Sequence, residues 1–244
     1  MFFNIFIIAL ARLLKLIYGY EAINLLLRIT PSFLTIAVLR HFGATIGTGV
    51  RIQAPFLIHN ADQTEPIYTN LTIGNDCYVG RDCIFDLMGK INIGNKVTIS
   101  HRAVLNTHTN AGKSPIACNR IKKSIGNIKI NDGTELISHV VLDGRTTIGA
   151  NCCIYPFASI GHCPQDLKYN GENTNLIIGN NTTIREFCSI NRGTIDSNET
   201  IIGNNSLLMA YVHVAHDCVV GDNVILANGV QLGGHVIIQN NVTV

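Results

Sequence analysis

The sequence predicts an all-β protein: a β-helix of six-residue repeats, preceded by a short helical N-terminal segment. Aliphatic residues recur at every sixth position over most of the 244 residues, and 47% of the chain is hydrophobic, so a long continuous core can form. The 22 glycines and the absence of tryptophan favour many tight turns over a helix bundle. A period of six matches neither a helix nor an ordinary strand. It fits a triangular prism in which each short strand points one aliphatic residue inward before the chain turns.

The inward positions define the geometry of the prism. Three repeats complete one coil, and successive coils stack about 4.8 Å apart. Residues eighteen apart within an unbroken register therefore lie directly above one another. The pairs of turn residues that begin at Gly74, Gly94, Gly179, Gly203 and Gly221 mark corners. The predicted inward residues are Ile46, Ile52, Ile58, Ile73, Val79, Phe85, Ile93, Ile99, Leu105, Ile130, Leu136, Leu142, Ile148, Ile154, Ile160, Ile178, Ile184, Ile190, Ile202, Leu208, Val214, Val220, Leu226, Leu232, Ile238 and Val244.

Residues 1–27 predict an amphipathic helix. Phe3 and Ile7 lie at helical spacing along an apolar face, and Arg12 and Lys15 lie opposite. Because Arg12 interrupts the apolar run and no basic segment precedes it, we expect neither a membrane span nor a signal peptide. Two interpretations stay open: a cap on the open end of the β-helix, which we favour, and a peripheral helix that contacts the inner face of the membrane with its basic residues.

A second short helix is expected between Thr30 and Arg40. The triplet Thr30-Pro31-Ser32 is typical of a helix N-cap with proline in the first turn, and His41 ends the helix. Both helices belong to an N-terminal segment that we assign to residues 1–41.

Composition excludes several classes of partner. Charged residues make up 14% of the chain and the formal net charge is +2, so no broad positive field exists to hold nucleic acid. The cysteines show no zinc-ligand spacing, and most sit inside apolar repeats, which predicts small core residues in a reducing, cytoplasmic setting and no metal. The eight cysteines are Cys77, Cys83, Cys118, Cys152, Cys153, Cys163, Cys188 and Cys218.

Three motifs in residues 130–244 are specific enough to indicate a family. They are NDGTELISHVVLDGRTTIGANCCIYPFASIG from Asn131, QDLKYNGE from Gln165 and HVAHDC from His213. Together they resemble the acyl-carrier-protein-dependent UDP-N-acetylglucosamine acyltransferases of lipid A synthesis. The resemblance implies a left-handed parallel β-helix, a homotrimer, and active sites in the clefts between neighbouring prisms.

The preceding coils differ. LRHFGATIGTGVRI from Leu39, IGNDCYVGRDCIF from Ile73 and IGNKVTISHRAVLNTHT from Ile93 instead resemble small-sugar O-acetyltransferases of the hexapeptide-repeat superfamily. The stretch ACNRIKKSIGNIK, residues 117–129, breaks the register. We therefore predict a fusion: acetyltransferase-like coils over 42–116, a junction at 117–129, and acyltransferase-like coils over 130–244.

Acyl transfer to a hydroxyl requires a base for the proton and a donor for the developing oxyanion. The resemblance makes His216 the base and Asp217 the partner that orients its imidazole. Gly234 is eighteen residues from His216, hence one coil above it, where the missing side chain lets a thioester oxygen approach the backbone. We therefore assign Gly234 as the oxyanion-donor candidate.

The resemblance also implies substrate contacts. His213 and His235 match positions near the substrates, and Asp166 and Lys168 lie on the loop that borders the sugar site. No cofactor is expected, because acyl-acyl carrier protein is itself the donor. The leading hypothesis is transfer of a 3-hydroxyacyl chain from acyl carrier protein to the 3-hydroxyl of UDP-N-acetylglucosamine, the first step of lipid A synthesis.

Three alternatives are open. An acetyl-CoA-dependent sugar O-acetyltransferase would use His108 of the NTHT motif. A zinc-dependent carbonic anhydrase of this fold is disfavoured, because its paired ligands lie further apart than the His213 to His216 spacing. The third is an inactive trimeric scaffold, because the resembled family continues past Val244 with further coils and a helical domain. On that ground we expect weak activity, or none, from these 244 residues.

Overall fold

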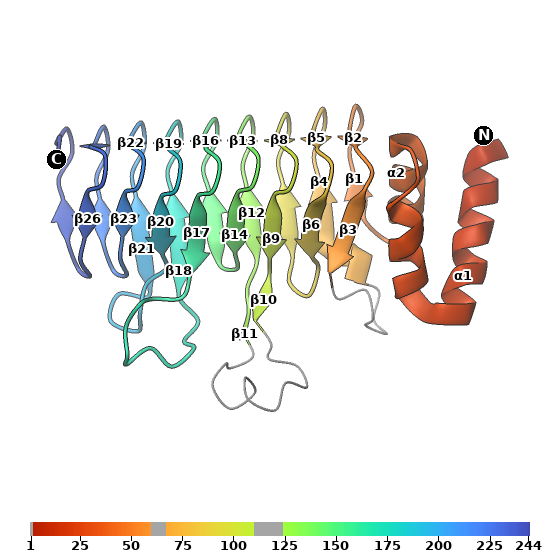
Figure 1. Cartoon of the computed structure of the whole chain (residues 1–244), viewed down its shortest axis with the longest axis horizontal. Coiled ribbons are helices and arrows are strands. Elements are labelled where there is room, and N and C mark those ends of the chain that lie inside the picture. Colours follow the sequence, from red (N-terminus) through yellow and green to blue (C-terminus); the bar gives the residue numbers. More distant parts are fainter. Residues whose placement is uncertain (1, 60–66, 110–123) are drawn as a thin grey trace.

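The computed structural model describes residues 2–59, 67–109 and 124–244. Its body is a three-sided prism of parallel strands, and two helices lie against its N-terminal end (Figure 1). The three sheets contain nine, eight and eight strands, and the chain visits each in turn. Strands that pair within these sheets run parallel, and each pair joins one coil to the next. The predicted β-helix is confirmed.

The strands are short and regular. The first sheet holds β1 Thr45–Ile46, β4 Leu71–Ile73, β7 Ile91–Ile93, β12 Ile128–Ile130, β15 Thr146–Ile148, β18 Asn175–Ile178, β21 Glu199–Ile202, β24 Val219–Val220 and β27 Ile237–Ile238. The second holds β2 Arg51–Ile52, β5 Tyr78–Val79, β8 Thr98–Ile99, β13 Glu135–Leu136, β16 Cys153–Ile154, β19 Thr183–Ile184, β22 Leu207–Leu208 and β25 Ile225–Leu226. The third holds β3 Phe56–His59, β6 Cys83–Asp86, β9 Val104–Asn106, β14 Val141–Asp143, β17 Ser159–His162, β20 Ser189–Asn191, β23 His213–Val214 and β26 Gln231–Leu232.

The predicted inward residues form the core. From Ile46 to Ile238 each of them is at most 8% exposed. Full burial of one such side chain stabilises the fold by about 1.5–3 kcal/mol. Val244, the last of the predicted set, is 47% exposed because no residue of the described chain stacks above it.

Coil stacking follows the predicted spacing. Ile130 pairs with Ile148 and Val214 with Leu232, so residues eighteen apart do lie above one another. Ile130 also pairs with Ile93, so the coils on either side of the predicted junction stack directly. Residues 117–123 of that junction, and Cys118, lie outside the described residues.

The corner between the first and second sheets is built by the predicted turn pairs. The Asn75 backbone N–H donates to Asn95 Oδ1 at 2.9 Å, and Asn180 N–H donates to Asn204 Oδ1 at 2.8 Å. A side chain at Gly74 would place Cβ 2.5 Å from the Gly94 carbonyl oxygen, so only glycine fits there. At this corner, backbone N–H groups thus donate to Asn and Asp side chains of the following coil, as the Asn95 N–H also does to Asp132 Oδ1 at 2.8 Å, and we call this set the corner ladder.

The corner between the second and third sheets carries a column of rings. The ring centroids of Phe157 and Phe187, and of Phe187 and Tyr211, are 5.0 Å apart with nearly parallel planes. This spacing is close to the ordinary distance between neighbouring strands, so each ring stacks on the coil below.

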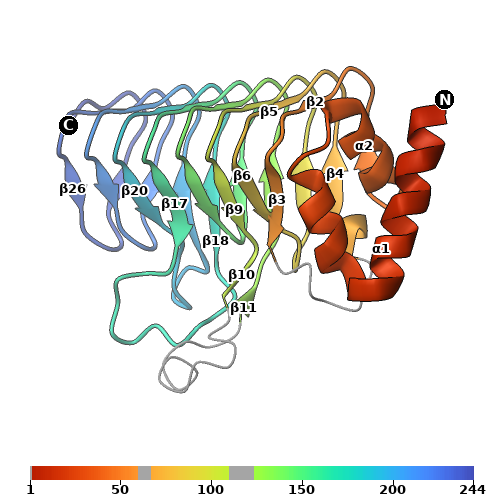
Figure 2. The same cartoon turned by 45° about the vertical axis from the view of Figure 1, so that its right-hand side comes forward.

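The third corner, between the third and first sheets, is where the longer connections leave the prism (Figures 1 and 2). The connection after β9 begins with β10 His108–Thr109 and returns through β11 Ser124–Ile125, which pair antiparallel. Residues 163–174 follow β17, and residues 192–198 follow β20. A short 3-10 helix, η1 Ile67–Asn70, precedes β4. Side chains on these connections are therefore gathered along one edge.

The two N-terminal helices, α1 Phe2–Leu27 and α2 Ser32–His41, cap the first coil. Asn24 Nδ2 donates to the Ile58 carbonyl at 2.8 Å, and its Oδ1 accepts from the Ile58 N–H at 2.9 Å. Ser32 Oγ accepts from the Ile52 N–H, and Arg40 donates to the Ile46 carbonyl. These side chains satisfy backbone groups that an open strand edge would leave unpaired. The predicted cap is confirmed.

Two details of the N-terminal segment differ from the prediction. The N-cap of α2 is Pro31 rather than Thr30, because the Pro31 carbonyl accepts the first helical hydrogen bond, from the Thr35 N–H at 3.0 Å. The Thr30 hydroxyl instead pairs with that of Thr35 at 2.9 Å. Helix α1 is not amphipathic with a basic outer face. Arg12 bonds His41 and Lys15 bonds the Tyr20 hydroxyl, so both basic side chains turn back toward the protein.

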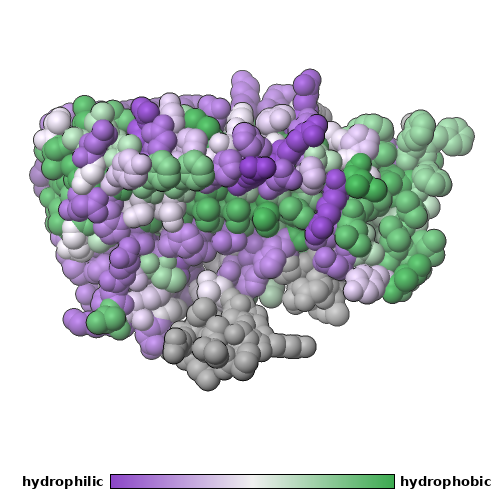
Figure 3. All heavy atoms as spheres, in the orientation of Figure 1, coloured by the Kyte–Doolittle hydropathy of each residue, from purple (hydrophilic) through white to green (hydrophobic). Residues whose placement is uncertain are grey.

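The outward face of α1 is apolar instead (Figure 3). By length and composition α1 could cross a membrane, and only 11% of its most apolar stretch of 18 residues is buried. Its helical geometry breaks at Tyr18 and Gly19. The straight part before the break is about 24 Å long at about 1.5 Å per residue, shorter than the roughly 30 Å hydrocarbon core of a bilayer. The most exposed apolar residues here are Phe2, Phe3, Ile5, Phe6, Leu13, Leu16 and Ile17.

Candidate active site

The central feature of the site is a His–Asp pair at the third corner. His216 and Asp217 follow β23, and His216 Nδ1 lies 2.8 Å from Asp217 Oδ2. The Asp217 side chain is completely buried, whereas the His216 side chain is 14% exposed. One imidazole edge is therefore held by the protein while the ring stays accessible. These are the two residues that the sequence analysis pairs as base and orienting partner.

Asp217 is an ionised acceptor. Thr194 donates to it twice, from its N–H at 2.8 Å and from its Oγ1 at 2.6 Å, and the Ser197 hydroxyl also donates. Burial alone would raise the pKa of Asp217, but the hydrogen bonds from Ser197, Thr194 and His216 outweigh it and lower the pKa well below its usual value. A carboxylate can only accept, so the proton between the two residues sits on His216 Nδ1. Nε2 is then free to act as a base.

Gly234 lies against the His216 ring, as the eighteen-residue spacing predicts. A Cβ at Gly234 would be 2.6 Å from His216 Cε1 and 2.9 Å from Nε2. Any side chain would therefore displace the imidazole. The Gly234 N–H donates to no acceptor in the described part of the chain, so it is available to a ligand.

His235 completes this cluster. Its ring centroid is 5.2 Å from that of His216, and its Nε2 lies 3.8 Å from carboxylate oxygens of both Asp217 and Asp196. His235 is about half exposed, so it can reach a ligand beside the dyad.

The other predicted contacts are not brought to the dyad within the described chain. His213 points its Nδ1 at Ser189 Oγ, 2.6 Å away on the neighbouring strand. Asp166 and Lys168 lie on the loop of residues 163–174, where Asp166 Oδ1 accepts the Lys168 N–H at 2.9 Å. No described contact joins this pair to His216.

Sequence reasoning missed the residues that build the dyad's surroundings. Thr194 and Ser197 lie on the connection after β20, and their contact with Asp217 depends on how that connection folds back. The only signal for them is that residues 192–198 interrupt the six-residue register just before the coil that carries His216.

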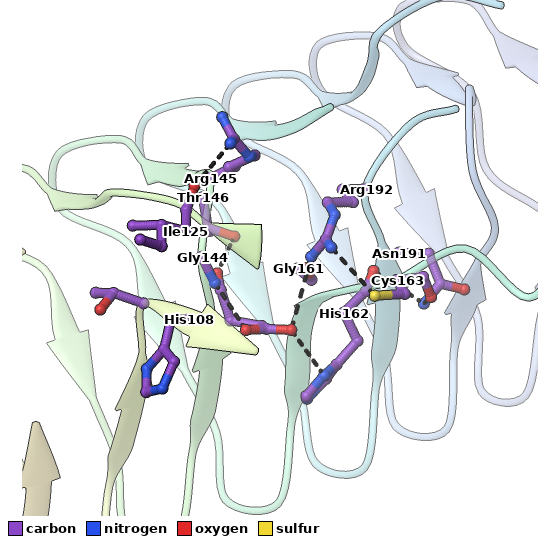
Figure 4. A network of polar contacts seen from close by, with 12 residues as sticks. His108, Ile125, Gly144, Arg145, Thr146, Gly161, His162, Cys163, Asn191 and Arg192 are labelled. Carbon is purple, nitrogen blue, oxygen red and sulfur yellow. Dashed lines mark hydrogen bonds and ion pairs between the residues drawn. The ribbon is translucent and has the colours of Figure 1, made fainter. Parts of the chain in front are cut away.

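A second polar network lies along the same corner, around Arg192 (Figure 4). Arg192 is 3% exposed; Nη1 donates to the Gly161 carbonyl at 2.9 Å, and Nη2 lies 3.1 Å from Cys163 Sγ. Asp143 Oδ2 is 3.6 Å from the guanidinium and 3.2 Å from His162 Nδ1.

Five of the seven described cysteines are buried in the core, as the sequence predicts, and Cys153 is half-buried. Burial raises the pKa of the Cys83 and Cys188 thiols to about 11, which makes them unreactive at neutral pH. Cys163 is exposed, at the base of the loop beside Arg192. All seven described cysteines carry free thiols.

A second His–Asp pair lies nearer the N-terminus. His108 Nδ1 is 2.5 Å from Asp86 Oδ2, the Asp86 side chain is 1% exposed, and that of His108 is 11% exposed. Burial would raise the pKa of Asp86, but hydrogen bonds from His108 and from the Met88 and Thr107 N–H groups lower it. The ring of His59 stacks on that of His108 with centroids 5.9 Å apart. The sequence singled out His108 but not its partner.

The residues His216, Asp217 and His235 are close enough to share a metal ion, since their ligand atoms all lie within 4.8 Å of one another. The chemistry of Asp217 disfavours it. Oδ1 already accepts from Thr194 N–H and Ser197, and Oδ2 from Thr194 Oγ1 and His216. Both oxygens are saturated by donors, so a metal would have to displace this hydrogen-bond set.

Fold and site together define a left-handed parallel β-helix of hexapeptide repeats with a His–Asp dyad at one corner. The family profile described as "Bacterial transferase hexapeptide (six repeats)" matches residues 199–234, the coils around the dyad. A curated acyl-[acyl-carrier-protein]–UDP-N-acetylglucosamine O-acyltransferase from Thermodesulfovibrio yellowstonii is 51% identical over 114 residues, 46% of this chain and 44% of that protein. The enzyme of the same description from Helicobacter pylori is 56% identical over 102 residues, 41% of this chain and 38% of that protein.

Solved structures agree on the fold. A UDP-N-acetylglucosamine acyltransferase from Arabidopsis is 31% identical, with a TM-score of 0.60, and the match covers 82% of this chain and 55% of that one. One from Francisella novicida is 27% identical, with a TM-score of 0.50, over 82% and 53%. This chain spans less than half the length of the curated relatives it matches.

Proposed function

We propose that this protein is an O-acyltransferase that moves a 3-hydroxyacyl chain from acyl carrier protein to the 3-hydroxyl of UDP-N-acetylglucosamine, in the first step of lipid A synthesis. The observation that carries the proposal is the His216–Asp217 dyad with Gly234 packed against it. The curated relatives are named acyl-[acyl-carrier-protein]–UDP-N-acetylglucosamine O-acyltransferase, and their similarity supports the choice of acyl carrier protein and UDP-N-acetylglucosamine as substrates.

The geometry suits the chemistry in three steps. His216 Nε2 would take the proton of the acceptor hydroxyl while that oxygen bonds to the thioester carbonyl carbon. The carbonyl oxygen would take up the displaced electron pair and be stabilised by the Gly234 N–H. As the carbonyl re-forms, the carbon–sulfur bond breaks, and the imidazolium gives its proton to the departing thiolate. Asp217 stays ionised throughout and holds the ring.

The remaining assignments belong to the same proposal. His213, His235, Asp166 and Lys168 would bind substrates, and no metal or cofactor takes part, because acyl-acyl carrier protein is the donor. We infer a homotrimer in the cytoplasm, with each site in a cleft between prisms. In such a trimer, residues of a neighbouring prism would lie beside the His216–Asp217 dyad.

The test is acyl transfer measured with radiolabelled 3-hydroxyacyl-acyl carrier protein. His216→Ala should lower the rate by about 10²- to 10⁴-fold, as expected for a lost general base. His101→Ala is the matched control, because His101 is exposed at the corner between the second and third sheets and, among the described rings, meets only His139, edge to face. Equal rates for the two variants would refute the role of His216.

A second candidate function rests on the His108–Asp86 pair, which repeats the geometry of the first dyad. We propose it as the site of an acetyl-CoA-dependent sugar O-acetyltransferase, carried by an N-terminal part fused to the acyltransferase-like coils. Its test is acetyl transfer to sugar hydroxyls by His108→Ala beside His216→Ala. Loss of acetyl transfer in the first variant alone supports two sites; loss in neither rejects the second.

We also propose that the apolar face of α1 rests on the inner face of the membrane. Phe2, Phe3 and Phe6 are each more than two-thirds exposed, and insertion of such a face among lipid headgroups would bury it. Changing the three phenylalanines to serine should reduce flotation with phosphatidylglycerol vesicles at least about tenfold. The control changes Phe157 and Phe187 to serine. A change of oligomeric state without loss of flotation would show that another copy covers this face.

A further inference from the structure

The loop of residues 163–174 carries both predicted sugar contacts, Asp166 and Lys168, but has few anchors of its own. Leu167 at its tip is fully exposed. Its internal bonds are local: Asn170 N–H donates to Glu172 at 2.8 Å, and the Tyr169 hydroxyl donates to the Glu172 carbonyl at 3.0 Å. Such bonds shape the loop without fixing it to the prism.

Side chains from outside the loop attach it to the prism. Asn191 Nδ2 donates to the Cys163 carbonyl at 3.0 Å and Arg145 Nη2 donates to Asn173 Oδ1 at 2.6 Å, so these two hold the ends of the loop.

Arg192 also reaches the middle of the loop. Its Nη2 donates to the Tyr169 hydroxyl at 3.0 Å and lies 3.1 Å from Cys163 Sγ, so it grips the loop at two points. Its Nη1 donates to the Gly161 carbonyl, which belongs to β17. Asp143 balances its charge from β14. The planar guanidinium can reach all these partners together, which a lysine ammonium cannot do.

The same short connection also holds the dyad. Two residues after Arg192, Thr194 donates to Asp217 from both its N–H and its hydroxyl. Between them, a Cβ at Gly193 would be 2.4 Å from the Glu199 nitrogen, so the backbone passes too close to the next strand for any side chain. Residues 192–194 therefore form a tightly packed link between the loop and the base.

We propose that Arg192 is a positioning residue that holds the loop of residues 163–174 in register with the His216–Asp217 dyad. The inference rests on the proposed acyltransferase function for its kinetic consequence only. Arg192 touches neither the reacting atoms nor the dyad itself. Its loss should loosen the loop and weaken sugar-nucleotide binding, while the base keeps its partner.

The experiment compares Arg192→Lys with Arg185→Lys, a matched change at an arginine that pairs with Glu186 and packs over Tyr155 on another face. Amide hydrogen exchange of peptides covering residues 163–174 should become at least about tenfold faster in Arg192→Lys only, the change expected for one lost charge-assisted hydrogen bond. The KM for UDP-N-acetylglucosamine should rise about tenfold, with kcat and its pH profile little changed.

Tyr169→Phe is the second variant, because it removes the hydroxyl that Arg192 grips and leaves the buried guanidinium in place. It should speed exchange in the same peptides, whether or not Arg192→Lys folds. Unchanged loop exchange in both variants, or a fall in kcat without a rise in KM, would overturn the inference. Faster loop exchange in a protein without acyl transfer would leave the link standing and reject the proposed function instead.

Discussion

Replacing Asp217 by Asn changes one oxygen to an amide nitrogen and nothing in volume. Asp217 accepts four hydrogen bonds, two at each oxygen. If the new NH₂ group faces the Thr194 N–H, two donors meet in a buried site. If it faces His216, it donates to Nδ1 and moves the ring proton to Nε2, which abolishes the free base. Either orientation damages the site.

The magnitude follows from this count. A wrong tautomer in a His–carboxylate dyad costs about 10⁴-fold in rate, so we expect acyl transfer by Asp217→Asn to fall about 10³- to 10⁴-fold. A buried donor left unsatisfied costs about 1–3 kcal/mol, so the free energy of unfolding should drop by about that amount. Radiolabelled acyl transfer and urea unfolding measure the two effects.

Asp222→Asn is the matched control, because Asp222 Oδ1 accepts from Asn204 in the corner ladder, where other coils use asparagine. It should leave both rate and stability nearly unchanged. Retention of more than a tenth of the wild-type rate by Asp217→Asn would refute the tautomer argument.

Three further predictions follow from other contacts. Gly234→Ala should lower acyl transfer at least about tenfold with little loss of stability, because its Cβ would meet the His216 ring; a normal rate in the transfer assay would contradict this. Asn24→Ala should cost about 2 kcal/mol in urea unfolding, since it strips the Ile58 N–H and carbonyl of their partners, whereas the exposed Asn4→Ala should cost almost nothing. Elemental analysis of the purified protein should find no stoichiometric zinc, and one zinc per chain would reverse the interpretation of the dyad.

The depressed pKa of Asp217 makes a pH prediction with a defined sign. A carboxyl whose folded-state pKa lies below its unfolded value stabilises the fold fully above the unfolded value, about 3.9 for Asp. That contribution is lost as the pH falls toward the folded-state pKa. The difference in unfolding free energy between wild type and Asp217→Asn should therefore be constant near neutral pH and shrink below about pH 4. A difference that grows on acidification would contradict the assignment.

The sequence predicted the parts of this protein that repeat. The six-residue period alone predicts which residues point inward. It also predicts that Gly234 lies beside His216, because residues eighteen apart stack where the coils are uninterrupted. It did not predict Asp86 beside His108, or Thr194 and Ser197 beside Asp217, because these pairs meet across connections of irregular length. The outer face of α1 was predicted with the wrong polarity, since a helix that is apolar on most sides gives no clear moment to read.

The confinement of long connections to one corner has a consequence for how such a chain can change. Whatever the length of the connection, the strand that follows it pairs in the same register with the strand of the previous coil. Ile130 pairs with Ile93, Ile178 with Ile148, and Ile202 with Ile178. Loop-closure entropy grows only slowly with length, so an insertion there costs the fold little. The corner ladder and the column of rings keep the coils in register at the other two corners of the prism. New binding surface can thus be added or exchanged along one margin of the prism while every core residue keeps its neighbours.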